Sequence, residues 1–378
     1  MRLGDKITIS QNVYCSKRWI SPSGKERYVL GAEDGIYVGK RGGLEKTLDF
    51  ELVTQIEFIE NPPLFLAVGG KIKHVKVWPS SVLDGGPGWP ITLDITMNCT
   101  HAALGKIDDA IVLAVSTAKR RIVLLKVDST KRFKKIKELG LADTCSSLKF
   151  FKDRLCAGYS NKFKVFDLKR LSESNDTEYP SKSDAGLSWI LNTQSLVPMA
   201  IFKFKSEYLL CYNCTVCLFV LFSSLFLTLF SMLAVGVFVN ESGKQCRKTE
   251  FKWISTPLSF GLMHSRLVVY NADFVEVFSL DDGEKLENIP LQAIAAVDAV
   301  ANLLVARGIV YSLRYVGNAV MDEISDESVL VDGGSSVFNP AAVEEPSSWT
   351  RSDSLFLKNA IAEADLEYVF SRLGSFSA

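Results

Sequence analysis

Pairs of short apolar runs recur along most of this 378-residue chain. In each pair, an apolar segment is followed by a short polar or glycine-containing turn and then by a second strand-like segment. Runs of this length, rich in β-branched and aromatic residues and bounded by turn residues, predict β-hairpins rather than helices. Seven pairs can be read, at residues 27–40, 64–78, 110–127, 153–168, 207–243, 265–280 and 302–316.

The spacing of these pairs predicts the architecture. Their starts lie roughly 35 to 60 residues apart, about 45 on average, which is the length of one four-stranded blade of a β-propeller. Weaker strand-like segments at 53–60 and 146–151 lie between the pairs. The W-D and G-H signatures of an ordinary WD40 array are absent from the sequence. We therefore expect an all-β chain that forms a single seven-bladed β-propeller, with apolar inner strands buried between neighbouring blades.

Glycine, proline and polar residues mark the expected connections. We expect loops at 82–90, which reads VLDGGPGWP, and at 171–186, which is polar and serine-rich. Glycine permits tight reversals because it adopts backbone conformations that other residues avoid. Tight turns are expected at Gly31, Gly35, Gly69, Gly70 and Gly158.

Composition shifts at the two ends predict the domain boundaries. We expect an N-terminal extension at 1–24, the propeller at 25–319, and an acidic and polar linker at 320–352. Residues 353–374 then carry apolar positions at helical spacing and end on a glycine, which predicts an amphipathic tail helix.

One segment breaks the pattern. Residues 214–234, CTVCLFVLFSSLFLTLFSMLA, carry no charge over about 20 residues, which is the length that spans a bilayer. The flanks, 207–213 and 235–243, nevertheless read as the two strands of one hairpin. A single crossing would separate the blades onto opposite sides of a membrane and leave open sheet edges. We favour a retained intron or a gene-model error, because codons for Phe, Leu and Ser are pyrimidine-rich; a genuine insertion and a true span are the alternatives.

Charge and cysteine content exclude several classes of function. Lys+Arg and Asp+Glu both number 43, so no global field attracts nucleic acid or acidic lipid. Cys211, Cys214 and Cys217 form C-x-x-C-x-x-C, but a zinc site needs a fourth ligand and no histidine is close in sequence. We expect structural thiols and no metal. The N-terminus has no signal-peptide pattern, which favours the reducing cytosol.

The sequence contains no P-loop, no kinase motifs and no G-x-S-x-G elbow, so we expect no enzyme, no catalytic residue and no cofactor. Basic residues cluster once. Their ordinary interpretation is a solvated face, and the functional one is a patch for an acidic lipid headgroup or an acidic protein surface. Nucleic acid fits poorly, since Phe133 is the single aromatic residue there. The candidate patch residues are Lys119, Arg120, Arg121, Lys131, Arg132, Lys134 and Lys135.

Several segments resemble the citron homology (CNH) domain of citron-type and myotonic-dystrophy-type Rho-effector kinases, Ste20-class kinases, fungal Rho guanine-nucleotide exchange factors and some vesicle-tethering proteins. The resemblance is carried, in family order, by residues 29–39, 48–71, 149–171, 195–213 and 235–284. It is distinctive around EYLLCY and GVFVNESG, and it is nearest to the exchange-factor and citron versions. It implies a propeller-like protein-interaction module.

The resemblance suggests a non-catalytic regulatory module of Rho-type small GTPase signalling. Its expected partners are Rho-family GTPases, a kinase or exchange factor, or cytoskeletal regulators, with no nucleic acid. We expect a cytoplasmic protein with at most peripheral membrane or cytoskeletal association. One alternative is a CNH module of an endosomal vesicle-tethering protein. The other is a single-pass membrane anchor through 214–234.

Overall fold

The computed structural model describes ten stretches of the chain. They are residues 2–3, 12–21, 24–40, 43–128, 130–152, 154–169, 176–214, 234–253, 255–307 and 309–313. The chain divides into two compact units, Met1–Gly317 and Asn318–Ala378, and all described residues belong to the first. The expected linker, the expected tail helix and residues 215–233 of the apolar run lie outside the described residues.

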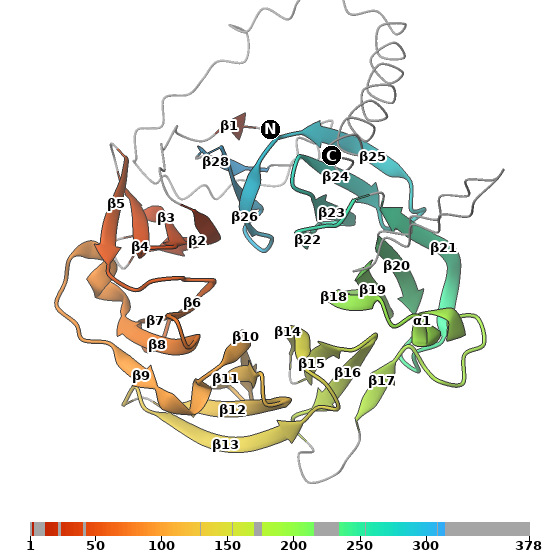
Figure 1. Cartoon of the computed structure of the whole chain (residues 1–378), viewed down its shortest axis with the longest axis horizontal. Coiled ribbons are helices and arrows are strands. Elements are labelled where there is room, and N and C mark those ends of the chain that lie inside the picture. Colours follow the sequence, from red (N-terminus) through yellow and green to blue (C-terminus); the bar gives the residue numbers. More distant parts are fainter. Residues whose placement is uncertain are drawn as a thin grey trace, which may run out of the picture. The chain divides into compact units, whose positions relative to one another are not determined.

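Twenty-eight strands in the described ranges form seven four-stranded antiparallel sheets. The sheets are arranged radially around one axis, as the blades of a propeller (Figure 1). From the axis outward, blade 1 holds β2 (Val13–Ile20), β3 (Glu26–Ala32), β4 (Ile36–Lys40) and β5 (Gly43–Leu48). Blade 2 holds β6 (Gln55–Ile59), β7 (Leu64–Gly69), β8 (His74–Pro79) and β9 (Ile91–Leu93), and blade 3 holds β10 (Cys99–Ile107), β11 (Ala110–Thr117), β12 (Arg121–Val127) and β13 (Phe133–Gly140).

The remaining blades follow the same order. Blade 4 holds β14 (Cys145–Phe151), β15 (Arg154–Tyr159), β16 (Lys162–Asp167) and β17 (Thr177–Tyr179), and blade 5 holds β18 (Leu196–Phe204), β19 (Glu207–Cys214), β20 (Ala234–Val239) and β21 (Gln245–Trp253). Blade 6 holds β22 (Ser259–Met263), β23 (Arg266–Tyr270), β24 (Phe274–Ser279) and β25 (Lys285–Pro290). Blade 7 holds β26 (Ile294–Asp298), β27 (Leu303–Ala306), β28 (Ile309–Ser312) and β1 (Arg2–Leu3). Short helices η1 (Ser80–Asp84), η2 (Asp94–Thr96) and α1 (Ser188–Asn192) lie in connections.

The seven-bladed all-β architecture expected from the sequence is confirmed. Each of the seven predicted pairs supplies the second and third strands of one blade. These middle strands are covered on both faces by neighbouring blades, which is why β7 and β20 are buried at every position and read as continuous apolar runs. The loop expected at 171–186 is partly wrong, because it contains the outermost strand of blade 4, β17.

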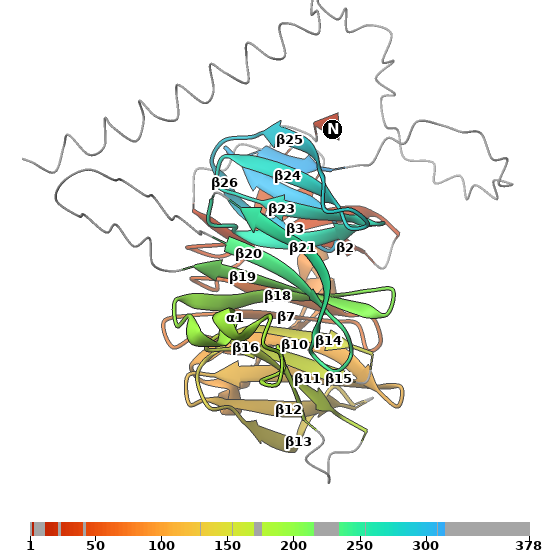
Figure 2. The same ribbon diagram turned by 90° about the vertical axis from the view of Figure 1, so that its right-hand side faces the viewer.

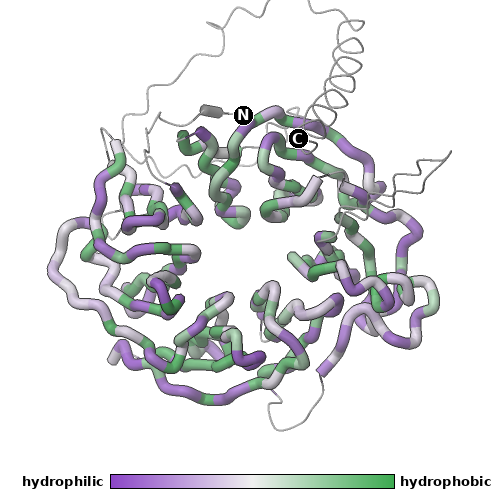
Figure 3. Tube along the Cα trace, viewed as in Figure 1, coloured by the Kyte–Doolittle hydropathy of each residue, from purple (hydrophilic) through white to green (hydrophobic). Residues whose placement is uncertain are grey.

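The hydrophobic core is divided among the interfaces between successive blades. One cluster joins Leu66 and Val75 of blade 2 to Leu113 and Val123 of blade 3. Corresponding clusters lie at each of the other interfaces, including the one where blade 7 meets blade 1. Coloured by hydropathy, the trace is therefore apolar within the blades and more polar along the outer strands and connections (Figure 3). Each blade is stabilised mainly by its two neighbours.

Three glycines expected in turns lie instead within strands, and one of them, Gly69, is the last residue of β7, where it pairs with His74. Gly31 belongs to β3 and Gly158 to β15, each opposite a bulge in the innermost strand of its blade. A Cβ atom on Gly31 would lie 2.5 Å from the sulfur of Cys15. These glycines therefore permit close packing against the innermost strand. Gly70, with φ of 75°, does occupy the turn expected of it.

The ring is closed by residues from both ends of unit 1. β1 pairs with β28 and completes blade 7, and β2 is the innermost strand of blade 1. The Asp298 carboxylate of β26 accepts a hydrogen bond from the backbone N–H of Arg18 in β2, at 3.1 Å. The expected N-terminal extension, 1–24, thus contains two strands of the propeller, and the expected start at residue 25 falls between two strands of blade 1.

Candidate protein-interaction site

The seven basic residues expected to form a patch all lie on blade 3, but at two ends of it. The turn between β11 and β12 lies at one end, where Arg121 pairs with Gly140. The turn between β12 and β13 lies at the other, where Val127 pairs with Phe133. Since β12 has seven residues, the ends are about 20 Å apart. The first group is Lys119, Arg120 and Arg121, and the second is Lys131, Arg132, Lys134 and Lys135.

Carboxylates on blade 3 and in its connection to blade 4 neutralise part of this charge. Glu138 accepts hydrogen bonds from Lys135 Nζ at 2.6 Å and from Arg121 Nη1 at 2.9 Å. These two cations, Lys135 first, lower the pKa of Glu138 and keep it ionised. Arg120 Nε lies 3.9 Å from Asp143 Oδ1. Arg120, Arg121 and Lys135 thus have carboxylate partners on blade 3 or in the connection that follows it, and the first group offers little free charge to a partner.

The second group is extended by a residue that sequence reasoning missed. Lys126 on β12 is the direct cross-strand partner of Lys134 on β13, and both are exposed. Directly opposed side chains of an antiparallel pair lie on the same face with Cβ atoms about 5 Å apart, and like charges there are destabilising. No carboxylate of the described residues lies within ion-pair distance of Lys126, Lys131 or Lys134. Lys126 stands within an apolar strand, so only the register reveals that it joins this basic end of blade 3.

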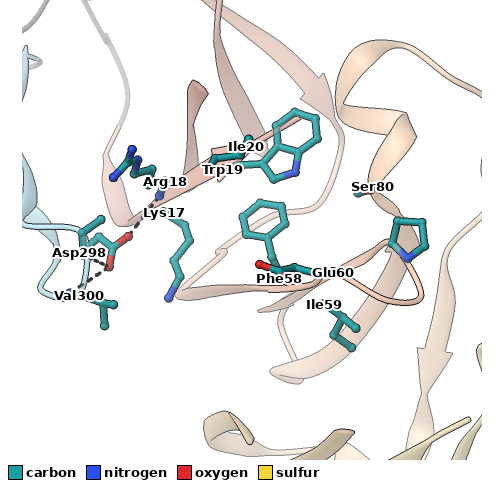
Figure 4. A pocket seen from close by; sticks show the side chains of 12 residues that line it. Lys17, Arg18, Trp19, Ile20, Phe58, Ile59, Glu60, Ser80, Asp298 and Val300 are labelled. Atoms are coloured by element: carbon teal, nitrogen blue, oxygen red, sulfur yellow. Dashed lines mark hydrogen bonds between the residues drawn. The ribbon is translucent and has the colours of Figure 1, made fainter. Parts of the chain in front are cut away.

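A second candidate feature is a cavity of about 550 Å³ between blades 7, 1 and 2 (Figure 4). The last residues of three innermost strands line it: Ile20 of β2, Ile59 of β6 and Asp298 of β26. The rings of Trp19 and Phe58 stack in its wall, with centroids 5.9 Å apart and planes 10° from parallel. Sequence reasoning missed this cavity because closure of the ring brings residues near 20 and near 298 together.

Charged groups of the inner cavity wall are already paired. Lys17 Nζ lies 2.9 Å from Glu57 Oε2. Burial alone would lower the pKa of Lys17, but the carboxylates of Glu57 and Asp298 together raise it, so the amine stays protonated. The Asp298 carboxylate accepts hydrogen bonds from the backbone N–H groups of Arg18 and Val300. A wall whose charges are paired in this way is suited to binding.

Comparison with known families identifies the domain. The model of the CNH domain matches residues 24–299, which lie almost entirely within the seven blades described above. This chain belongs to the CNH domain family. A solved structure, the AfRom2 CNH domain, superposes with a TM-score of 0.64 at 19% identity, and the alignment covers 83% of this chain and 98% of that one. The resemblance inferred from sequence and the propeller fold are both confirmed.

Curated relatives contain this CNH domain as a small part of larger proteins. The human serine/threonine-protein kinase MRCK alpha is 25% identical over 282 residues, which cover 74% of this chain and 15% of the kinase. Rho1 guanine nucleotide exchange factor 1 of Schizosaccharomyces pombe is 20% identical over 324 residues, covering 75% of this chain and 22% of that protein. The chain therefore spans less than a quarter of the length of these relatives.

The strands that flank the apolar run form one hairpin of the CNH domain, as the sequence predicts. β19 and β20 lie side by side in blade 5 (Figure 2), and Asn213 pairs with Ala234 at the end where the run begins and ends. The chain thus leaves and re-enters the blade at adjacent positions. None of the helices in the described ranges has the length and apolarity needed to traverse a membrane.

Most thiols of the CNH domain are buried in the blade interfaces. Burial raises the pKa of Cys99 to about 12 and that of Cys145 to about 11, so neither is a reactive thiolate at neutral pH. In the C-x-x-C-x-x-C segment, Cys211 is fully buried and Cys214 half-buried, while Cys217 lies outside the described residues. Within the described ranges, no three His, Cys, Asp or Glu side chains are grouped as metal ligands.

Proposed function

We propose that this CNH domain is a regulatory protein-interaction module of Rho-type small GTPase signalling. In this proposal it binds a GTPase or a cytoskeletal regulator through its propeller loops, and so brings that partner to a kinase or exchange factor. The observation that carries the proposal is the family match over 24–299, together with curated relatives that are kinases and a Rho1 exchange factor. These relatives favour Rho signalling over the endosomal-tether alternative.

We further propose that the domain acts by binding alone, without a cofactor, and that it works in the cytoplasm. Support comes from the extent of the kinase match, which takes in 15% of MRCK alpha and coincides with the CNH propeller. The hairpin geometry at Asn213 and Ala234 argues against the single-pass alternative, because one crossing would carry the chain about 30 Å across a bilayer.

The proposed contact for an acidic partner is the basic end of blade 3, centred on Lys126 and Lys134. Two like charges held opposite each other cost stability in the free protein. An acidic partner surface would remove that repulsion, so the pair should speed association in a salt-dependent way.

The test is a pull-down of the full chain with Rho-family GTPases loaded with GDP or with a non-hydrolysable GTP analogue. We expect one nucleotide state to bind and the double variant K126E/K134E to weaken that binding by about tenfold or more. The matched control is K244E/K248E, the same charge change on exposed lysines at the start of the outer strand of blade 5. Absence of binding to every GTPase in both states would overturn the proposal.

A further inference from the structure

The cavity between blades 7, 1 and 2 is surrounded by unusually exposed apolar side chains. Val300 is 83% exposed and Ile20 is 62% exposed, and both line the cavity. Pro63, in the turn between β6 and β7, is also exposed and lines the cavity. These residues come from the turns and strand ends of three successive blades on one face of the ring. Large apolar side chains left in water around a hollow are typical of an interaction surface rather than of an inert loop.

The volume of the cavity suits a bulky side chain. Its volume of about 550 Å³ lies inside the range of roughly 300–1,000 Å³ typical of ligand pockets. Trp19 and Phe58 stack within its wall, facing the space that Lys17 and Asp298 border from the other side (Figure 4). An aromatic or aliphatic side chain of a ligand, its apolar anchor, would contact these rings. The exposed Ile20 and Val300 would contact the ligand residues on either side of that side chain. A ligand that uses both must be longer than one side chain.

The charges around the cavity indicate which residue of a ligand should lie next to the apolar anchor. Lys17 is paired with Glu57, and Arg18 with Glu26 at 2.9 Å, so both cations are neutralised. Glu60 lines the cavity and is exposed, and no cation among the described residues lies within ion-pair distance of it. The charge left for a ligand is therefore negative, and a lysine or arginine beside the apolar anchor would complement it.

We propose that this cavity is a docking groove for a segment of a partner protein that presents a bulky apolar side chain next to a basic residue. The apolar side chain lies against the Trp19–Phe58 stack, and the basic residue pairs with Glu60. The groove lies on blades 7, 1 and 2, whereas the basic residues considered for an acidic partner lie on blade 3. It therefore does not rest on the proposed Rho function, and either can fail without the other.

The test uses a random dodecapeptide library displayed on phage and selected on the full chain. Enriched peptides are synthesised with a fluorescent label, and their affinities are measured by anisotropy. We expect the enriched sequences to share a bulky apolar residue beside Lys or Arg. We expect I20D/V300D to weaken their binding by about tenfold or more, and the control I72D to leave it unchanged. Ile72 is 53% exposed and lies in the turn between β7 and β8, outside the cavity lining.

A charge swap separates recognition from damage to the fold. The E60K variant should bind the enriched peptide more weakly than the wild-type chain does. It should bind more tightly than wild type a second peptide, in which the basic residue is replaced by glutamate. If a thermal melt shows that the double variant is unfolded, the single variant V300D replaces it in the binding test, because Val300 lies in a turn and is exposed to solvent. The proposal is overturned if enriched peptides lack the apolar–basic pair or bind I20D/V300D as tightly as wild type. It is also overturned if the exposed residues instead mediate self-association that I20D/V300D abolishes in sedimentation.

Discussion

The ion pair between Glu207 and Arg247 ties two strands of blade 5 to each other and to blade 6. Arg247 donates from Nε to Glu207 Oε2 at 2.8 Å and makes a second bond through Nη2, while Nη1 donates to the Leu280 carbonyl. The guanidinium also lies 4.0 Å from the centre of the Phe238 ring. Both charged side chains are only 20% exposed, so this pair should contribute more than an ordinary surface ion pair.

The pH dependence of stability should reveal this pair. Its hydrogen bonds from Arg247 are the main cause that lowers the pKa of Glu207 below its ordinary value of 4.5. A carboxyl group whose pKa is depressed on folding stabilises the protein above its unfolded pKa, and the stabilisation is lost as pH falls through the folded pKa. We expect E207Q to lower the free energy of unfolding by about 1 kcal/mol at neutral pH, and the difference from wild type to shrink below about pH 4. Urea unfolding at both pH values measures it.

The matched control for this prediction is E241Q in the same blade. Glu241 lies 3.8 Å from Lys203 and is 67% exposed, so its loss should change stability little at either pH. An equal destabilisation of E207Q at neutral and acidic pH would mean that the effect is packing rather than charge. The sequence alone could not predict this contact, because the partners lie 40 residues apart with the apolar run between them.

At the scale of elements, the middle strands of each blade were predictable and the edge strands were less so. β7 and β20 are buried on both faces, so their sequences are apolar throughout and stand out from the turns. The outermost strands β9 and β17 have three residues each, and such short segments carry no period that distinguishes them from a loop. The two parts of the candidate site differ likewise: Lys131–Lys135 is visible as a cluster, whereas Lys126 and the cavity depend on strand register and ring closure.

The register of blade 5 leads to a prediction about the apolar run. Asn213 and Ala234 are direct partners in an antiparallel ladder, so a tight turn of a few residues can join β19 to β20. We expect replacement of 215–233 by Asn-Gly with short flanks to preserve the fold. A shorter loop should stabilise it by about 1 kcal/mol through a lower entropy of closure. Circular dichroism melts of the full chain and of this variant measure the change.

A Gly/Ser segment of the same length as 215–233 is the control that separates loop length from apolar character. If the run is an insertion without a structural role, that variant should melt close to the original chain, because loop length is unchanged. Loss of the β-sheet spectrum in both variants would contradict the prediction and would show that blade 5 needs the apolar residues themselves.

At the scale of the whole molecule, stability depends on closing the ring. Every interface between blades holds one cluster of the core, and the last interface is formed by Val13 and Leu30 of blade 1 with Ala296, Val305 and Val310 of blade 7. A propeller that lacks its innermost first strand exposes both this interface and the one with blade 2. The sequence predicted the number of blades from their spacing, but not the strands before residue 25, because β2 is half-exposed and β1 has only two residues.

Truncation tests whether the propeller needs those strands. A chain of residues 25–378 lacks β2, and with it the buried side chains of Val13 and Trp19 and the amide that pairs with Asp298. Burying each such side chain contributes about 1.5–3 kcal/mol, and several of these terms together approach the roughly 5–15 kcal/mol by which a domain is stable. We therefore expect this chain to be insoluble or to lack a cooperative melt.

The control is truncation at the other end of the chain. Truncation after Gly317 removes no described strand, so it should leave the melting temperature unchanged. A cooperative melt of 25–378 at the temperature of the full chain would mean that blade 1 closes the ring with three strands, and that the domain begins at residue 25 after all.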